Sequence, residues 1–82
     1  MKKIVEVYYR GGVRPDADKV IRDAAKPFNV REQGSGCALF GYCERDISLL
    51  VDATNVSPFS RKLRASSTLR RLKARIVVSE QS

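Results

Sequence analysis

The stretch from Gly34 to Ile47, "GSGCALFGYCERDI", gathers residue types that support several kinds of chemistry. It contains both cysteines of the chain and three of its five glycines. Glycine amides cradle phosphates in nucleotide-binding loops, and paired thiols bind metals or form redox pairs. The structural alternative is that the glycines only shape the turn of a β-hairpin.

Two phosphate-binding motifs can be tested directly on this stretch. A Walker loop ends in Gly-Lys-Ser/Thr and leads into a helix, whereas "GSGCALFG" has no lysine and leads toward a strand-like run. A dinucleotide-binding fingerprint fails because it also requires a helix there. A small anion nest of Gly-Ser-Gly amides remains an alternative. We expect residues 34–45 to form a glycine-rich connection between two strands, with Arg45 and Asp46 as a local turn and ion pair.

The two cysteines are Cys37 and Cys43. Two thiolates supply half of a zinc site, and a chain without histidine offers no usual completion, so we expect no metal. A redox pair between Cys37 and Cys43 is an alternative to two free thiols packed as small hydrophobes.

The absence of histidine also removes the commonest general base and the usual partner of nucleophilic serine or cysteine. With no catalytic motif in the chain, we predict a protein that is not an enzyme and needs no cofactor. No apolar run reaches the length of a membrane span, and the "MKKIVEVYY" start is unlike a signal peptide. We therefore expect a cytoplasmic protein without a membrane partner.

Positive charge is concentrated in one segment. The chain carries a net charge of +7, and residues 53–79 contain no acidic residue. The basic residues of this segment are Arg61, Lys62, Arg64, Arg70, Arg71, Lys73 and Arg75. The other nine basic residues balance the nine acidic ones, so this segment carries all of the excess charge. Such asymmetry predicts binding to nucleic acid, another polyanion or an acidic protein surface.

Most of these cations fall on one expected helix. Ser57 is a good N-cap with Pro58 after it, and we expect the helix to continue to Arg71 or Leu72. Phe59, Leu63, Ser66 and Leu69 would face inward, whereas Arg61, Arg64 and Arg71 would lie outside with Ser60, Ser67 and Thr68. Arginine and short hydroxyl side chains are the groups that hold phosphate oxygens. A solvated basic surface is the plain alternative.

The remaining elements must position this helix. Strands are predicted at residues 4–9, 28–33, 46–53 and 75–79, and a helix at residues 16–26, where Ala17, Val20, Ile21, Ala24 and Ala25 form one apolar stripe. The order strand–helix–strand–strand–helix–strand in one domain of residues 1–82 predicts a ferredoxin-like α+β sandwich, a four-stranded antiparallel sheet with two helices on one face.

This element order resembles the ferredoxin-like superfold, which RNA-recognition motifs, small-ligand regulatory domains and dimerisation modules share. The superfold alone does not assign a role. "DISLLVDA" has no aromatic residue, so the aromatic signature of RNA-recognition motifs is absent. By analogy with regulatory domains, "RGGVRPD" is a further place for a ligand.

One sheet face is expected to be left uncovered by the helices. If Val5, Val7 and Tyr9 point inward, then Ile4, Tyr8 and Leu50, with Val77 beside them, lie on the open face. An apolar open face is often covered by a second copy or a partner.

Two functions follow. The first is a small binding module whose basic helix contacts DNA or RNA phosphates. The alternative is an interaction or inhibitory module, for example an accessory protein of a mobile element, which docks on an acidic protein surface or forms a homodimer through its sheet.

Overall fold

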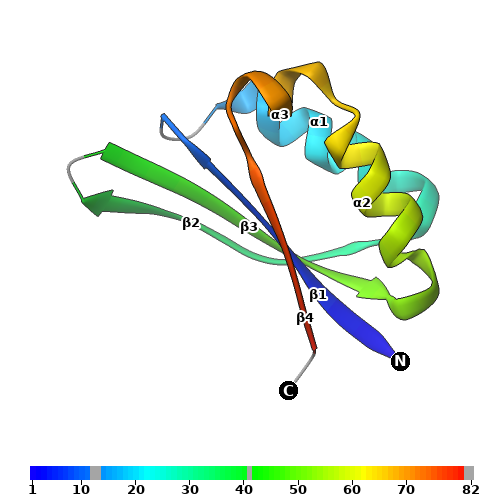
Figure 1. Cartoon of the computed structure of the whole chain (residues 1–82). Helices are drawn as coiled ribbons and strands as arrows, with labels where there is room; N and C mark the ends of the chain where they lie inside the picture. The colour runs from blue at the N-terminus through cyan, green and yellow to red at the C-terminus, as the bar shows by residue number, and fades with distance from the viewer. Residues whose placement is uncertain (12–13, 41, 81–82) are drawn as a thin grey trace.

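The computed structural model describes residues 1–11, 14–40 and 42–80, without the side chains of residues 37–43. The chain forms four main strands and three α-helices with two short 3₁₀ turns (Figure 1). The strands are β1 (Lys2–Arg10), β2 (Arg31–Phe40), β3 (Tyr42–Asp52) and β4 (Arg75–Glu80). The helices are α1 (Pro15–Ala25), α2 (Val56–Arg64) and α3 (Ser67–Arg71), with 3₁₀ turns η1 (Lys26–Phe28) and η2 (Ala53–Asn55).

The sheet order is β2-β3-β1-β4, and all three strand pairs are antiparallel. The helices cover one face of this sheet, and the opposite face has no layer on it among the described residues (Figure 1). This arrangement confirms the predicted ferredoxin-like α+β fold.

Period-two patterning sets the faces of the two central strands. Every second residue of β1 and β3 is buried under the helices; these residues are Val5, Val7, Tyr9, Ile47, Leu49 and Val51. From the helices, the predicted stripe of α1 contributes Ala17, Ile21, Ala24 and Ala25, and the basic helices contribute Phe59, Leu63 and Leu69. Burial of a side chain such as Phe59 or Leu63 contributes about 1.5–3 kcal/mol to folding, so this layer fixes where the helices sit.

The prediction of a long connection at residues 34–45 was wrong. β2 continues to Phe40 and β3 begins at Tyr42, so most of the glycine-rich stretch is paired backbone. The pairing between the strands outweighs the poor strand propensity of Gly34 and Gly36, because propensity in sheets depends strongly on context. At the other end, β2 begins at Arg31 rather than Phe28, which lies in η1.

The single basic helix was also an incorrect prediction. α2 ends at Arg64, and Ser66 then caps a separate helix, α3, by accepting a hydrogen bond from the Leu69 amide at 3.3 Å. A serine side chain competes for backbone hydrogen bonds and favours such a start. α2 itself begins at Val56 after η2, so Pro58 is the third residue of the helix and not the first. Its missing N–H still falls in the first turn, where no intrahelical partner exists.

The cysteine prediction falls largely outside the described part of the chain. In the strand register, Cys37 lies opposite Arg45 and Cys43 lies opposite Leu39. The side chains of both cysteines are beyond what the structure describes, so the redox pair remains a prediction.

Candidate functional site

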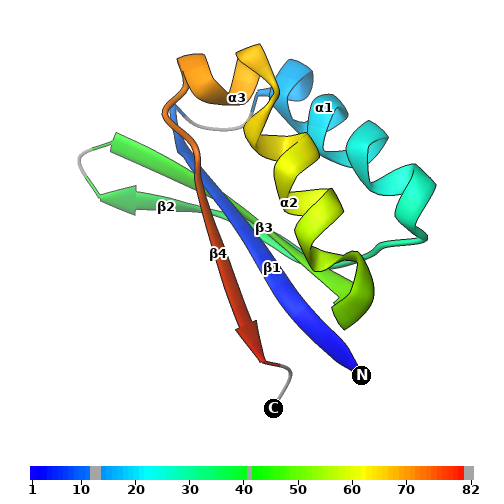
Figure 2. The ribbon, with the colours of Figure 1, turned by 45° about the vertical axis from the view of Figure 1, so that its right-hand side comes forward.

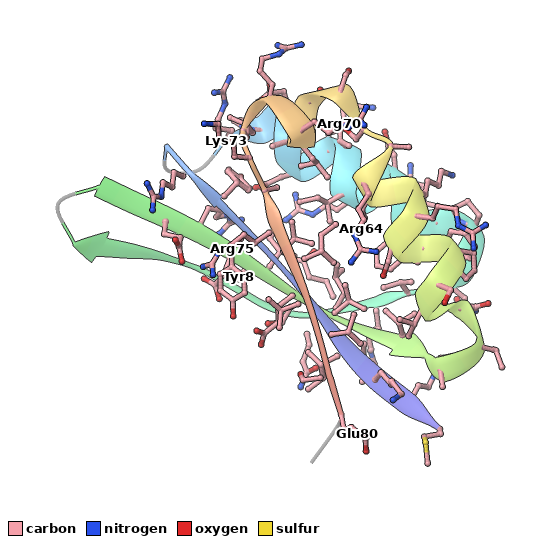
Figure 3. All side chains as sticks on the ribbon, viewed as in Figure 1. Tyr8, Arg64, Arg70, Lys73, Arg75 and Glu80 are labelled. Carbon is pink, nitrogen blue, oxygen red and sulfur yellow. The ribbon has the colours of Figure 1, made fainter. Side chains whose placement is uncertain are left out.

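The predicted basic residues are divided by the fold into three places. Arg61, Arg64 and Arg70 lie along the outer side of the α2–α3 pair, next to β4. Lys62 turns toward η1, where its ammonium lies 5.9 Å from the centre of the Phe28 ring. Figure 3 shows Arg64 and Arg70 on the helices, on the other side of β4 from Arg75.

Arg75 therefore does not belong with the helix arginines. It lies opposite Tyr8 in the β1–β4 register, so its side chain is on the open face. There its guanidinium lies 5.2 Å from the centre of the Tyr8 ring and 3.3 Å from a Glu44 carboxylate oxygen. Lys73 lines a hollow with Tyr8, Arg10 and Arg75 at this end of β1. Arg75 was predicted on the last strand, and strand alternation sends its side chain to the open face, away from the helix arginines.

Two adjacent hollows between the helix pair and β4 form what we call the arginine groove. The first measures about 300 Å³ and is lined by Val56, Ser57, Ser60, Arg61, Arg64 and Val78. The second measures about 290 Å³ and is lined by Leu63, Arg64, Leu69, Arg70, Ala74 and Ile76. Arg64 is common to both, so the two hollows follow one another along the strand.

Serine residues of α2 differ in their accessibility. Ser57 is exposed, but Ser60 is only 4% exposed, which overturns its expected place on the outer face. Within the described part of the chain, the Ser60 hydroxyl oxygen has no hydrogen-bond partner. Ser60 also lines the first hollow, but its hydroxyl oxygen is itself buried beneath the groove surface.

Most cations of α2 and α3, and the adjoining Lys73, form no ion pair with the described acidic residues. Among the described residues, no ion pair involves Arg61, Arg64, Arg70, Arg71 or Lys73. Part of this charge suits the helices themselves, because basic residues close the last turns of both α2 and α3. A cation at a helix C-terminus contributes about 0.3–1 kcal/mol, whereas like charges three or four residues apart cost about 0.2–0.5 kcal/mol per pair. The helix dipole therefore does not account for so many unpaired cations.

The open face carries the residues predicted for an interaction. Ile4, Tyr8 and Leu50 are each half-buried there, and Val77 is 41% exposed. Glu6 lies in the middle of this face and accepts hydrogen bonds from the Tyr8 and Ser48 hydroxyls. The Glu6 hydrogen bond, followed by burial, raises the pKa of Tyr8 to about 12. A carboxylate in its centre makes this face less apolar than the sequence pattern predicted.

A buried polar cluster was missed by the sequence analysis. The Arg45 guanidinium lies 3.0 Å from one Asp18 oxygen, and the Tyr9 hydroxyl donates to the other oxygen at 2.6 Å. The Arg14 amide in turn donates to the Tyr9 oxygen at 3.2 Å. Arg45 was predicted to form a turn with Asp46, but it is a β3 residue that reaches α1. The available signal was Tyr9, since a buried tyrosine hydroxyl usually finds a polar partner.

Contacts within the cluster shift the pKa values of Asp18 and Arg45 toward their charged forms. Burial raises the pKa of the Asp18 carboxyl, but hydrogen bonds from Tyr9 and Arg45 outweigh it and hold the pKa below its usual value. The hydrogen bond to Asp18 is the main reason that the pKa of Arg45 is raised. This buried ion pair joins α1 to β3, and we assign it a structural role. Among the described residues, the Arg45 Nε has no hydrogen-bond partner.

None of the described helices has the length and apolar character needed to cross a membrane. No protein-family model matches the chain, and no curated protein matches its sequence.

Solved structures share the fold at low sequence identity. The regulatory subunit of aspartate kinase from Thermus thermophilus has a TM-score of 0.66 at 8% identity, over 94% of this chain and 49% of that one. An unknown protein from Galdieria sulphuraria has a TM-score of 0.64 at 16% identity, over 100% of this chain and 46% of that one. This chain thus spans about half the length of both proteins. The de novo designed protein Foldit4 has a TM-score of 0.66 at 18% identity, over 100% of this chain and 98% of that one. These similarities establish the fold and no more.

Proposed function

We propose that the chain is a small non-enzymatic binding module whose α2–α3 pair binds nucleic-acid phosphates, mainly without reading the base sequence. The observation that carries this proposal is the set of exposed cations on α2 and α3 that have no acidic partner among the described residues. Phosphate contacts from such residues position a protein on nucleic acid but carry no sequence information.

The arrangement of the arginines suits a repeating anion. Arg61, Arg64 and Arg70 follow the arginine groove, and each guanidinium has the planar donors that hold phosphate oxygens in pairs. Ser57, exposed in the first turn of α2, adds a hydroxyl beside them. Arg71 is also exposed on α3, so a backbone passing over the helices meets several cations.

The experiment is a titration of mixed-sequence oligonucleotides at several salt concentrations. Each neutralised phosphate contributes about −0.9 to the slope of log affinity against log salt for duplex DNA. Replacing Arg61, Arg64 and Arg70 with glutamine should therefore reduce the magnitude of the slope by nearly three and weaken binding strongly. Unchanged retention of nucleic acid by this variant would disprove the proposal.

The chain offers a matched control on α1 and the first residue of η1. Lys19, Arg22 and Lys26 are also exposed, but each is already paired, with Asp23, Glu32 and Asp23 respectively. Changing these three to glutamine removes the same formal charge as the groove variant. Binding should be much less affected, because two neighbouring carboxylates, Asp23 and Glu32, offset most of their charge. If both variants lost the same oligonucleotide affinity, binding would depend on the net charge of the protein and not on the groove arginines.

A second candidate function is a protein-interaction module that pairs through the open face, as a homodimer or with a partner. Exposed Val77 beside half-buried Ile4 and Leu50 favours it. One protein of similar fold is the regulatory subunit of an enzyme, which is compatible with such a role. A solution mass that stays that of one chain, with and without nucleic acid, would argue against the homodimer.

A further inference from the structure

β4 forms one edge of the sheet, and its outer side is unoccupied among the described residues. The strand is exposed over most of its length, with Val77 and Val78 each 41% exposed. Figure 2 shows β4 with β1 on one side and the helix pair above it. An edge strand presents unpaired amide and carbonyl groups, and proteins usually protect such edges with lysine, proline or a covering element. Among the described residues, the β4 edge has no lysine, proline or covering element, and its charged residues, Arg75 and Glu80, stand at its two ends. The backbone between them is therefore available to another strand.

The arginine groove runs beside this edge. Val78 lies opposite Val5 and Ile76 opposite Val7, so both side chains point to the helix side of the sheet. They line the two hollows, with Arg61 and Arg64 above Val78, and Arg64 and Arg70 above Ile76. A strand added outside β4 would therefore place every second side chain beneath these arginines and the others near Val77 on the open face.

We propose that the β4 edge and the arginine groove together bind an extended acidic segment of a partner protein, which adds to the sheet as a fifth strand. This inference goes beyond the proposed function: it uses the same cations but gives them an acidic protein segment as their ligand. Its chemistry is more specific. Main-chain hydrogen bonds to β4 supply affinity, and alternate acidic side chains facing Arg61, Arg64 and Arg70 supply specificity.

A second copy of the chain fits this edge poorly. Antiparallel pairing of two β4 strands around a two-fold axis keeps the helices of both copies on the same face of the joined sheet. The arginine rows would then face one another across the junction without acids between them. Like charges placed opposite each other are destabilising, so charge complementarity favours an acidic partner.

A single nucleic-acid strand makes less use of the same features. Single-strand binding usually combines cations with aromatic side chains on which bases stack. The residues lining the two hollows include no aromatic residue. The exposed β4 backbone would also have no role in holding phosphates.

The experiment uses a capped synthetic peptide that alternates glutamate and valine, titrated into the full chain. Amide hydrogen exchange is recorded for β4 in parallel. We expect binding to slow exchange of the outward-facing amides of β4, because they become hydrogen-bonded to the added strand. Replacing Arg61, Arg64 and Arg70 with glutamine should weaken peptide binding by about tenfold or more, as expected for loss of charge-assisted hydrogen bonds. A peptide that alternates lysine and valine is the matched control and should not bind.

Proline variants separate the peptide from nucleic acid. Along an antiparallel edge strand, amides alternate between those that face the neighbour and those that face outward. Either Val77→Pro or Val78→Pro therefore removes an outward amide and leaves the β1 ladder intact. The variant that removes the outward amide is the one of the two whose thermal unfolding is unchanged. It should lose peptide binding and keep oligonucleotide binding, since no charge has changed.

The outcomes distinguish the two proposals. Peptide binding without slowed exchange in β4 would overturn strand addition, as would peptide binding that survives both proline variants. Oligonucleotide binding with no peptide binding would overturn the inference and support the proposed function. Peptide binding without oligonucleotide binding would support the inference and remove nucleic acid as the ligand. Binding of neither probe would overturn both.

Discussion

Cations near α1 and cations on the α2–α3 pair differ in whether they have acidic partners inside the chain. Lys19 and Arg22 on α1 and Lys26 at the start of η1 each pair with an acid. Arg45 reaches α1 to pair with buried Asp18. On α2 and α3, the described ion pairs involve none of the arginines.

The charged side chains near α1 and those along the arginine groove therefore have different roles. Around α1, charges are satisfied inside the chain, so they contribute to the fold. Along the arginine groove they are satisfied only by solvent or by a partner. This difference predicts that substitutions in the first region act on stability and that substitutions in the second act on binding.

The largest expected effect is on stability, at the buried ion pair. Removing either Asp18 or Arg45 by substitution with alanine should lower the free energy of unfolding by about 3–5 kcal/mol, because the remaining charge stays buried without a partner. Urea denaturation followed by circular dichroism measures this loss. The control is Lys19→Ala, which breaks a solvent-exposed pair and should change the free energy of unfolding only slightly.

A double-mutant cycle sharpens the assignment. Asp18→Ala with Arg45→Ala should cost clearly less than the sum of the single losses, since the second change removes a charge that the first left unpaired. Additive losses would mean that the pair does not couple α1 to β3.

The next effect is the pH dependence of the same pair. The folded pKa of Asp18 lies below its unfolded value of about 3.9, so the unfolded chain binds the proton first as pH falls. The stability due to Asp18 is thus fully present above about pH 4 and is lost as pH falls through the folded pKa. Urea midpoints between neutral and acid pH measure this. The Arg45→Ala variant should show a weaker loss from this site, and an identical profile would contradict the assignment.

A smaller effect is expected at the break between α2 and α3. Ser66→Ala removes the cap of α3 and should lower the free energy of unfolding by about 1 kcal/mol. Ser67→Ala is the control, because Ser67 is the exposed first residue of α3 and alanine suits a helix there. If the two variants unfold at the same urea concentration, the Ser66 cap does not stabilise the arrangement of α2 and α3.

The smallest effect on stability is expected in the arginine groove. Arg61→Gln with Arg64→Gln should change the free energy of unfolding by less than about 0.5 kcal/mol, since lost dipole stabilisation and relieved repulsion nearly cancel. The same variant should lose much of its affinity for oligonucleotide or acidic peptide. A large loss of stability would show that these arginines belong to the fold and would erase the contrast between the two regions.

The predictable part of the fold came from periodic apolar residues. Val5, Val7 and Tyr9 alternate in β1, and Ile21 with Ala24 repeats at helical spacing, so the faces of these elements were determined locally. The glycine-rich hairpin and the break at Ser66 were not predictable, because both depend on competition between backbone partners. Strand pairing was available to Gly34 and Gly36, and Ser66 offered the Leu69 amide an alternative to a continuous helix.

The sequence by itself determined the layered α+β fold and the confinement of the excess charge to one acid-free segment, because periodicity and composition are properties of the chain. Only the tertiary structure decided how that charge is divided. It sent Arg75 to the open face, aligned Arg61, Arg64 and Arg70 along an exposed edge strand, and joined Arg45 to Asp18. These juxtapositions depend on sheet order and on contacts between residues far apart in the chain, and local sequence patterns do not encode either one.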